Sequence, residues 1–116
     1  MPTIAEEMLT AARRLCEEVS RLRFGPPVTH VYNPLEYAWG PQRRYIEKYG
    51  ATRKRVVLLG MNPGPFGMGQ TGVPFGDVAR VREFLGIEGT VGRPAHEHPE
   101  RPVLGFGCTR SEVSGA

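Results

Sequence analysis

The sequence has few cysteines and no long apolar run, and these absences exclude several classes of protein. Cys16 and Cys108 are its two cysteines, and they form neither a metal-binding spacing nor a disulfide framework. A reducing compartment is therefore the simpler expectation. No basic region followed by an apolar one marks a secretory signal, and no run approaches the roughly 20 apolar residues that span a bilayer. We expect a soluble, intracellular protein that contacts no membrane.

Length and composition predict one domain with extensive loops. The chain has 116 residues, of which 40% are hydrophobic, enough for a single core over residues 1–116. Fifteen glycines and 11 prolines predict long, well-defined loops. A net charge of +3 is compatible with a polyanionic partner but does not require one.

Two helical regions are expected before residue 50. Thr3 and Glu6 form a capping-box pattern, which predicts a helix over about residues 4–23. Apolar residues at helical spacing define one stripe on it: Ile4, Ala5, Met8, Ala12, Leu15, Val19 and Leu22. Asn33-Pro34 is typical of a second helix start, and Gly50 of a helix end.

The run Val56-Val57-Leu58-Leu59 predicts a strand that is buried on both faces of a parallel sheet. Residues 28–32 and 103–104 are weaker strand candidates. These features predict an α/β fold. Because a parallel sheet needs more strands than this chain supplies, we expect residues 1–116 to be the front portion of a longer domain.

A loop rich in glycine and proline follows the predicted strand, with the sequence GMNPGPFGMGQTGVPFG from Gly60 to Gly76. Beyond it, Gly76 or Asp77 is expected to cap a helix whose apolar face is formed by Val78, Val81, Phe84 and Leu85. In open α/β sheets, ligands bind where such a loop joins a strand to a helix. The glycines admit close approach to the backbone, and Asn62 offers an amide that donates and accepts. The loop predicts a pocket for a planar, partly polar molecule.

Two other interpretations of this loop remain open. It could bind a nucleotide phosphate, although it contains no lysine and neither common phosphate-binding glycine pattern. It could also be a purely structural turn in which Phe66 and Met68 fill the core.

The loop resembles the first active-site motif of the single-strand-selective monofunctional uracil-DNA glycosylases, a branch of the uracil-DNA glycosylase superfamily. Flanking segments are similar as well: YNPLEYAW at 32–39, EHPERPVLG at 97–105 and SEVSGA at 111–116. The resemblance covers nearly the whole chain and about the N-terminal half of the family's domain. It implies a partial uracil-DNA glycosylase-like fold with three α/β/α layers around a parallel sheet.

The resemblance also implies roles for five residues. Asn62 would position the attacking water, and Phe75 would stack on a uracil flipped out of the DNA. Met61 would contact the base, with Phe66 beside it in the substrate-binding loop. Gly64 would leave room for substituents on uracil C5, as in 5-hydroxymethyluracil.

The implied activity is base-excision repair: hydrolysis of the N-glycosidic bond of uracil and 5-substituted uracils in single- and double-stranded DNA. No metal or other cofactor is implied, and the expected protein is a nuclear monomer whose partner is DNA containing uracil or oxidised uracil.

Several family elements are expected beyond Ala116. These are the asparagine that reads the uracil edge, the histidine of an H-P-S-P motif and the loop that wedges into DNA. His96 could substitute for that histidine, or His96 and His98 could bind a metal together. Two histidines two positions apart in a loop are, however, more typical of surface residues. The rival hypothesis is a truncated, non-catalytic form that binds single-stranded nucleic acid weakly.

Overall fold

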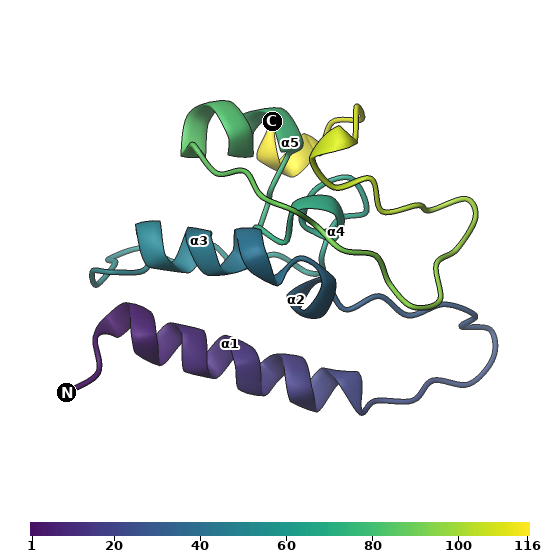
Figure 1. The fold of residues 1–116 in the computed structure, drawn as a ribbon, viewed down its shortest axis with the longest axis horizontal. Coiled ribbons are helices and arrows are strands. Elements are labelled where there is room, and N and C mark those ends of the chain that lie inside the picture. Colours follow the sequence, from purple (N-terminus) through teal and green to yellow (C-terminus); the bar gives the residue numbers. More distant parts are fainter.

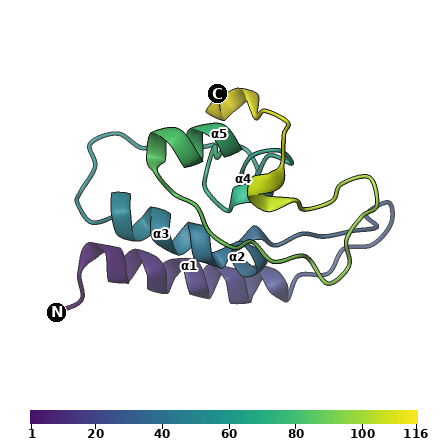
Figure 2. The ribbon, with the colours of Figure 1, turned by 45° about the horizontal axis from the view of Figure 1, so that its top comes forward.

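A computed structural model describes all residues from Met1 to Ala116, and it contains helices and irregular segments without any strand. The helices form three levels (Figure 1). Helix α1 (Ile4–Ser20) lies along one side, α2 (Pro34–Tyr37) and α3 (Trp39–Tyr49) lie next to it, and the short elements after residue 60 lie on the far side of α3. Figure 2 shows the same order from a second direction. None of the helices is both long and apolar enough to cross a bilayer.

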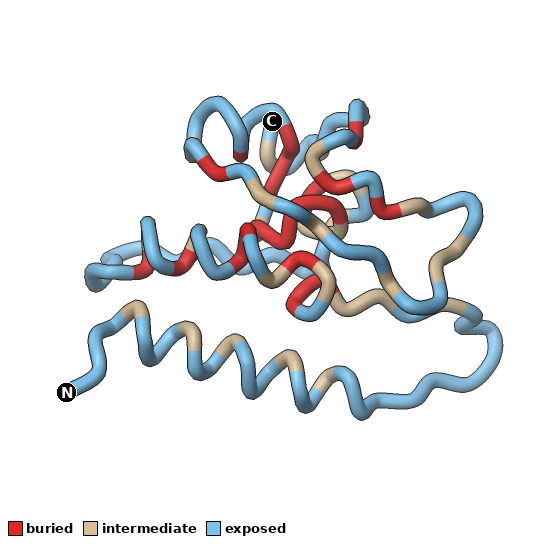
Figure 3. Tube along the Cα trace, in the orientation of Figure 1, coloured by how far each residue is buried: buried red, intermediate tan, exposed pale blue.

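Local capping chemistry sets the start of α1 as the sequence predicts. Thr3 Oγ1 accepts the Glu6 backbone N–H at 3.1 Å, and the Glu6 carboxylate accepts the Thr3 N–H at 2.7 Å. The helix ends at Ser20, three residues earlier than predicted. No residue of α1 is buried (Figure 3), and Met8 and Leu15 on the predicted stripe are about half exposed. The helix therefore packs on one side only.

Asn33 joins α1 to α2, and the helix start predicted at Asn33-Pro34 is confirmed. Its Oδ1 accepts the Leu35 N–H at 3.2 Å and so caps α2. Its Nδ2 donates to Ser20 Oγ at 2.8 Å and to the Cys16 carbonyl at 3.2 Å. Gly50 ends α3, also as predicted, and its N–H donates a hydrogen bond to the Ile46 carbonyl.

The predicted α/β fold with a parallel sheet is wrong, because the chain forms no strand and is 43% helical. Val56, Val57, Leu58 and Leu59 lie in an irregular segment with exposed fractions between 75 and 95%. A strand exists only when a neighbour takes up its backbone groups, and both weaker candidates bond elsewhere. Leu104 donates its backbone N–H to the Gln70 side chain, and Val28 donates its backbone N–H to the Gly25 carbonyl within a local turn.

The helix predicted after residue 77 is present but changes its geometry. Asp77 caps α5 (Val78–Arg80), as predicted, and the chain continues as the π-helical turn η1 (Val81–Leu85). A π turn holds more residues than an α turn, so positions after Val81 leave the 100° spacing. Phe84, which was predicted on the buried face, is consequently 82% exposed.

The core lies between α3, the end of the glycine-rich loop and the segment that follows it. Val73, Val81 and Ile87 are fully buried there, with four partly buried neighbours: Tyr45, Tyr49, Leu85 and Phe106. The Tyr49 hydroxyl donates to the Leu85 carbonyl at 2.8 Å. This small core supports one end of the loop that carries the predicted site.

Candidate functional site

The glycine-rich loop places its predicted site residues in different surroundings. Met61 is 95% exposed, and Asn62 is exposed with no hydrogen bond to its side chain. Phe66 is half-buried beneath the guanidinium of Arg110, whose carbon lies 4.0 Å from the ring centre. The loop thus presents Met61 and Asn62 to solvent and anchors itself through Phe66.

Phe75 adopts a left-handed backbone conformation, with φ at 57°. Such a conformation is uncommon for a bulky residue and is strained. The Phe75 ring is about a third exposed and lies against Gly60, where a Cβ would stand 3.2 Å from ring atom Cζ. The structure therefore brings the first and last parts of the loop together, with Gly60 leaving the space that the ring occupies.

Gly64 lies against a carboxylate from the C-terminal segment. A side chain at Gly64 would overlap the carboxylate of Glu112, and Gly67 is covered by the same residue. Glu112 precedes the short 3-10 turn η3 (Val113–Gly115) and accepts the Ser114 hydroxyl at 3.1 Å. The space that was predicted to receive a substituted uracil thus adjoins a negative charge.

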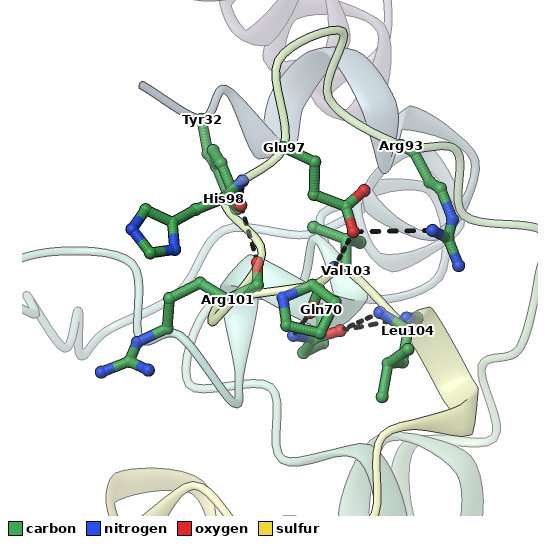
Figure 4. Close-up of polar contacts among 10 residues, drawn as sticks. Tyr32, Gln70, Arg93, Glu97, His98, Arg101, Val103 and Leu104 are labelled. Atoms are coloured by element: carbon green, nitrogen blue, oxygen red, sulfur yellow. Dashed lines mark hydrogen bonds and ion pairs between the residues drawn. The ribbon is translucent and has the colours of Figure 1, made fainter. Parts of the chain in front are cut away.

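Gln70 is the residue whose side-chain hydrogen bonds hold the loop in place. It lies in α4 (Met68–Thr71) and is 5% exposed. Its Nε2 donates to the carbonyls of Pro65 and Pro102, both at 3.1 Å. Its Oε1 accepts the N–H groups of Leu104 at 2.7 Å and Gly105 at 3.0 Å (Figure 4). A buried amide with all four bonds made holds the loop against residues 102–105.

Asp77 links the C-terminal segment to the end of the loop by hydrogen bonds. Its Oδ1 accepts the Glu112 N–H and the Ser111 hydroxyl, each at 2.9 Å. These bonds, led by that from Glu112, lower the pKa of the Asp77 carboxyl, against the opposing effect of burial. Asp77 is therefore both the helix cap that the sequence predicted and a cross-link to residues 111–112.

A cavity of about 560 Å³ opens on one side of the loop. Its wall includes Pro63, Gly64 and Pro65 from the loop, and Tyr32 and Tyr37 from the α2 region. The cavity is also lined by residues 28–30, His98 and Arg101. No aspartate or glutamate lines it, although Glu112 contacts Gly64. Of the predicted site residues, only Gly64 borders this cavity.

Both cavity tyrosines are held by bonds to the backbone. Tyr37 donates to the Gly69 carbonyl, and burial raises its pKa, with smaller effects from Tyr32 and Glu97. The Tyr32 hydroxyl donates to the Arg101 carbonyl and accepts the His98 N–H, each at 2.7 Å (Figure 4). The two rings meet edge to face at 6.3 Å. They form a rigid aromatic wall whose hydroxyl groups are already engaged.

Three histidine rings gather beside the cavity, and two of them, His30 and His98, line it. His30 stacks on His96 at 4.4 Å and meets His98 edge to face at 4.5 Å. Desolvation and the two neighbouring imidazoles lower the pKa of His30. A nitrogen lone pair lies in the plane of its ring, so two rings stacked face to face do not converge on one metal ion. No group of three potential ligands in the structure could hold a metal.

Sequence reasoning missed the residues that build this region. Gln70, Glu112, Tyr32, Tyr37 and Arg101 were not singled out, because nothing in their local pattern shows that they meet. One signal was present: Gln70 is a long polar residue inside an otherwise apolar and glycine-rich stretch, which suggests a buried amide with backbone partners.

Curated proteins of three mammals share most of this sequence. The chain is 56% identical over 114 residues to a rat (Rattus norvegicus) protein named single-strand selective monofunctional uracil-DNA glycosylase. Proteins of the same name from mouse (Mus musculus) and cattle (Bos taurus) are 55% identical over the same length.

The match covers 98% of this chain but only 41 to 42% of each relative. The chain therefore spans about two fifths of the length of the curated relatives it matches. No family model matches it. The resemblance to single-strand-selective monofunctional uracil-DNA glycosylases that the motifs suggest is confirmed.

Proposed function

We propose, from its similarity to single-strand-selective monofunctional uracil-DNA glycosylases, that this chain carries one half of a uracil-excision site. The reaction is hydrolysis of the N-glycosidic bond of uracil, and of 5-substituted uracils such as 5-hydroxymethyluracil, in single- and double-stranded DNA. The observation that carries the proposal is 56% identity to a named glycosylase over 98% of the chain. The relatives' names favour this function over a non-catalytic binding role.

Asn62 is the residue that we assign to the attacking water. Its side chain is exposed and makes no hydrogen bond within the protein, so its amide oxygen is available to accept one from water. An amide is too weak a base to remove a proton early. The glycosidic bond, however, breaks toward an oxocarbenium-like sugar, for which orientation and electrostatics matter more than basicity. Water oxygen then bonds to C1′, the bonding electron pair leaves on uracil N1, and the water proton neutralises that anion.

Phe75 and Gly64 are assigned to the base. The Phe75 ring is partly exposed and packed against Gly60, which supports it as a fixed stacking surface for a flipped uracil. Gly64 has no side chain to meet a substituent on uracil C5. The Glu112 carboxylate fills the space beside Gly64, so entry of a substituted base there requires this side chain to move.

The other elements of the proposal follow from the same similarity. Met61 contacts the base, and Phe66 supports the loop from its place under Arg110. The partner is DNA containing uracil or oxidised uracil, bound by a monomer in the nucleus. The exposed cluster Arg53-Lys54-Arg55 is available to contact DNA phosphates.

An excision assay tests the proposal directly. The 116-residue chain is incubated with a single-stranded oligonucleotide that carries one uracil, and alkali then cleaves the strand at any abasic site. Because the chain carries one half of the site, we expect slow cleavage by the wild-type chain and its loss in the Asn62→Ala variant. Arg14→Ala, which changes an exposed residue of α1, is the matched control and should cleave like the wild type.

The outcome separates the possible functions. Equal cleavage by the wild type and the Asn62→Ala variant would contradict the role of Asn62. No cleavage by a chain that melts cooperatively and retains oligonucleotide binding would contradict catalysis by this chain and favour the binding role.

A further inference from the structure

The cavity beside the glycine-rich loop combines aromatic walls with an unpaired cation. Tyr32 and Tyr37 form one wall, and the His30 and His98 rings stand at the rim. Arg101 also lines the cavity, and its guanidinium bonds only the carbonyl of the adjacent residue, Glu100. It belongs to none of the three ion pairs of the chain, which use Arg43, Arg82 and Arg93. Its charge is therefore available to a ligand.

The composition of the wall selects the chemistry of that ligand. No aspartate or glutamate lines the cavity, but the Glu112 carboxylate meets its wall at Gly64, so an anionic group of the ligand belongs beside Arg101 and away from Gly64. The tyrosine hydroxyls are bonded to the backbone, which leaves their rings, rather than their polar ends, to contact a ligand. The lowered pKa of His30 favours its neutral form, in which the ring offers an uncharged planar surface. A planar base joined to a phosphate matches all three features, and the cavity volume is in the range of small-molecule sites.

The position of the cavity relates this ligand to the excision site. Gly64 lines the cavity, and it lies two residues from Asn62. Their Cα atoms are therefore at most about 7.6 Å apart. Gly64 is also assigned to the target base, so the cavity begins where the target site ends, which suits neighbouring units of one polymer better than two separate molecules.

We propose that the cavity between Tyr32, Tyr37 and Gly64 binds the nucleotide next to the target in single-stranded DNA. The flanking base stacks on the tyrosine and histidine rings, and Arg101 contacts its phosphate. This inference rests on the proposed function, because it places the target nucleotide at Asn62. It assigns to residues outside the glycine-rich loop the task of holding the strand.

Binding of a uracil-free strand tests the inference separately from excision. The probe is a fluorescein-labelled oligo(dT) 10-mer, and its binding to the 116-residue chain is followed by fluorescence anisotropy over a range of salt concentrations. Arg101→Gln should weaken binding about fivefold and lower the slope of log K against log salt by about 0.7, the value for one phosphate contact in a single strand. Arg14→Gln, an exposed change outside the cavity, should keep the wild-type slope.

Stacking is tested with a second strand of equal length and charge that lacks its bases. The wild-type chain should bind this abasic strand roughly tenfold more weakly than oligo(dT). His30→Ala should reduce that ratio, and it is a mild change because the His30 side chain bonds only to Thr29. A cooperative thermal melt of each variant shows that it is folded.

Two results would overturn the inference: wild-type affinity and salt slope in Arg101→Gln, or equal binding of the base-bearing and abasic strands. Either result leaves the proposed excision untouched, since excision is measured on a uracil strand. Conversely, absence of excision with unchanged oligo(dT) binding would contradict the proposed function and the place of the target, while leaving single-strand binding in the cavity.

Discussion

The side-chain oxygen of Gln70 accepts the backbone N–H of Leu104 at 2.7 Å, a bond between residues 34 positions apart. Three further bonds from the same amide reach Pro65, Pro102 and Gly105. One side chain thus sets the position of the glycine-rich loop relative to the segment that closes the cavity. The stability of the candidate site depends on residues other than those assigned to its chemistry.

Replacing Gln70 tests this dependence. Gln70→Leu would leave the buried N–H of Gly105 and the partly buried N–H of Leu104 without partners, so we expect a loss of about 2 to 3 kcal/mol in the free energy of unfolding. Gln42→Leu is the matched control, because Gln42 is also buried but its Oε1 has no partner. That change should be neutral or stabilising, as urea denaturation would show. Equal losses in both variants would contradict the role of the Gln70 bonds.

Acid should release the C-terminal segment through Asp77. The folded protein lowers the Asp77 pKa from its ordinary value of 3.8, so the stabilisation is present above that pH. It is lost as the pH falls through the lower folded value. Asp77→Asn should be less stable than the wild type at pH 7 and lose less stability between pH 5 and pH 2. Thermal melts across this range measure both effects.

A control for the acid experiment is Glu83→Gln, which changes an exposed carboxylate that makes no hydrogen bond. It should melt like the wild type at pH 7. An Asp77→Asn variant with the wild-type acid profile would show that Asp77 does not link residues 111–112 to the loop.

Alanine usually stabilises a folded protein more than glycine does at the same position, but the left-handed backbone at Phe75 reverses this order. Both Phe75→Ala and Phe75→Gly lose the ring that packs on Gly60, but only alanine retains the backbone strain. We expect the glycine variant to be more stable by about 1 kcal/mol. At Ala79, an exposed position in α5, glycine should instead lower stability by up to about 1 kcal/mol. Denaturation curves that rank alanine above glycine at position 75 would contradict the observed conformation.

The exposed apolar segment Val56–Leu59 should promote self-association. Large exposed apolar stretches favour aggregation and bind hydrophobic dyes. Leu58, 77% exposed, makes a suitable target. Leu58→Lys should lower the fluorescence of bound 1-anilinonaphthalene-8-sulfonate and raise the solubility limit without lowering the melting temperature. Thr52→Lys, an exposed change in the same loop, controls for the added charge. Unchanged dye binding in Leu58→Lys would mean that another surface is responsible.

The elements that the sequence predicted correctly depend on neighbouring residues. Thr3 and Glu6 cap α1, Asn33 and Pro34 begin α2, and Asp77 begins α5, each through bonds within a few residues. The sheet failed for lack of distant partner strands, and Phe84 turned outward because residues 81–85 form a π turn instead of an α turn. A run of valine and leucine specifies a buried strand only if another strand lies beside it. The roles of Asn62, Gly64 and Phe75 stay predictions, and their positions are now described.

The sequence by itself determined where the main helices begin, where the glycine-rich loop lies and which family that loop resembles. These features depend on residues that are close together in the sequence. Only the tertiary structure decided that Glu112 lies against Gly64, that Gln70 and Asp77 tie the loop to residues 102–112, and that two tyrosines and Arg101 line a cavity beside it. The physical reason is range. The capping bonds join residues two or three positions apart, whereas these contacts span about 30 to 70 positions and form only after the chain has packed.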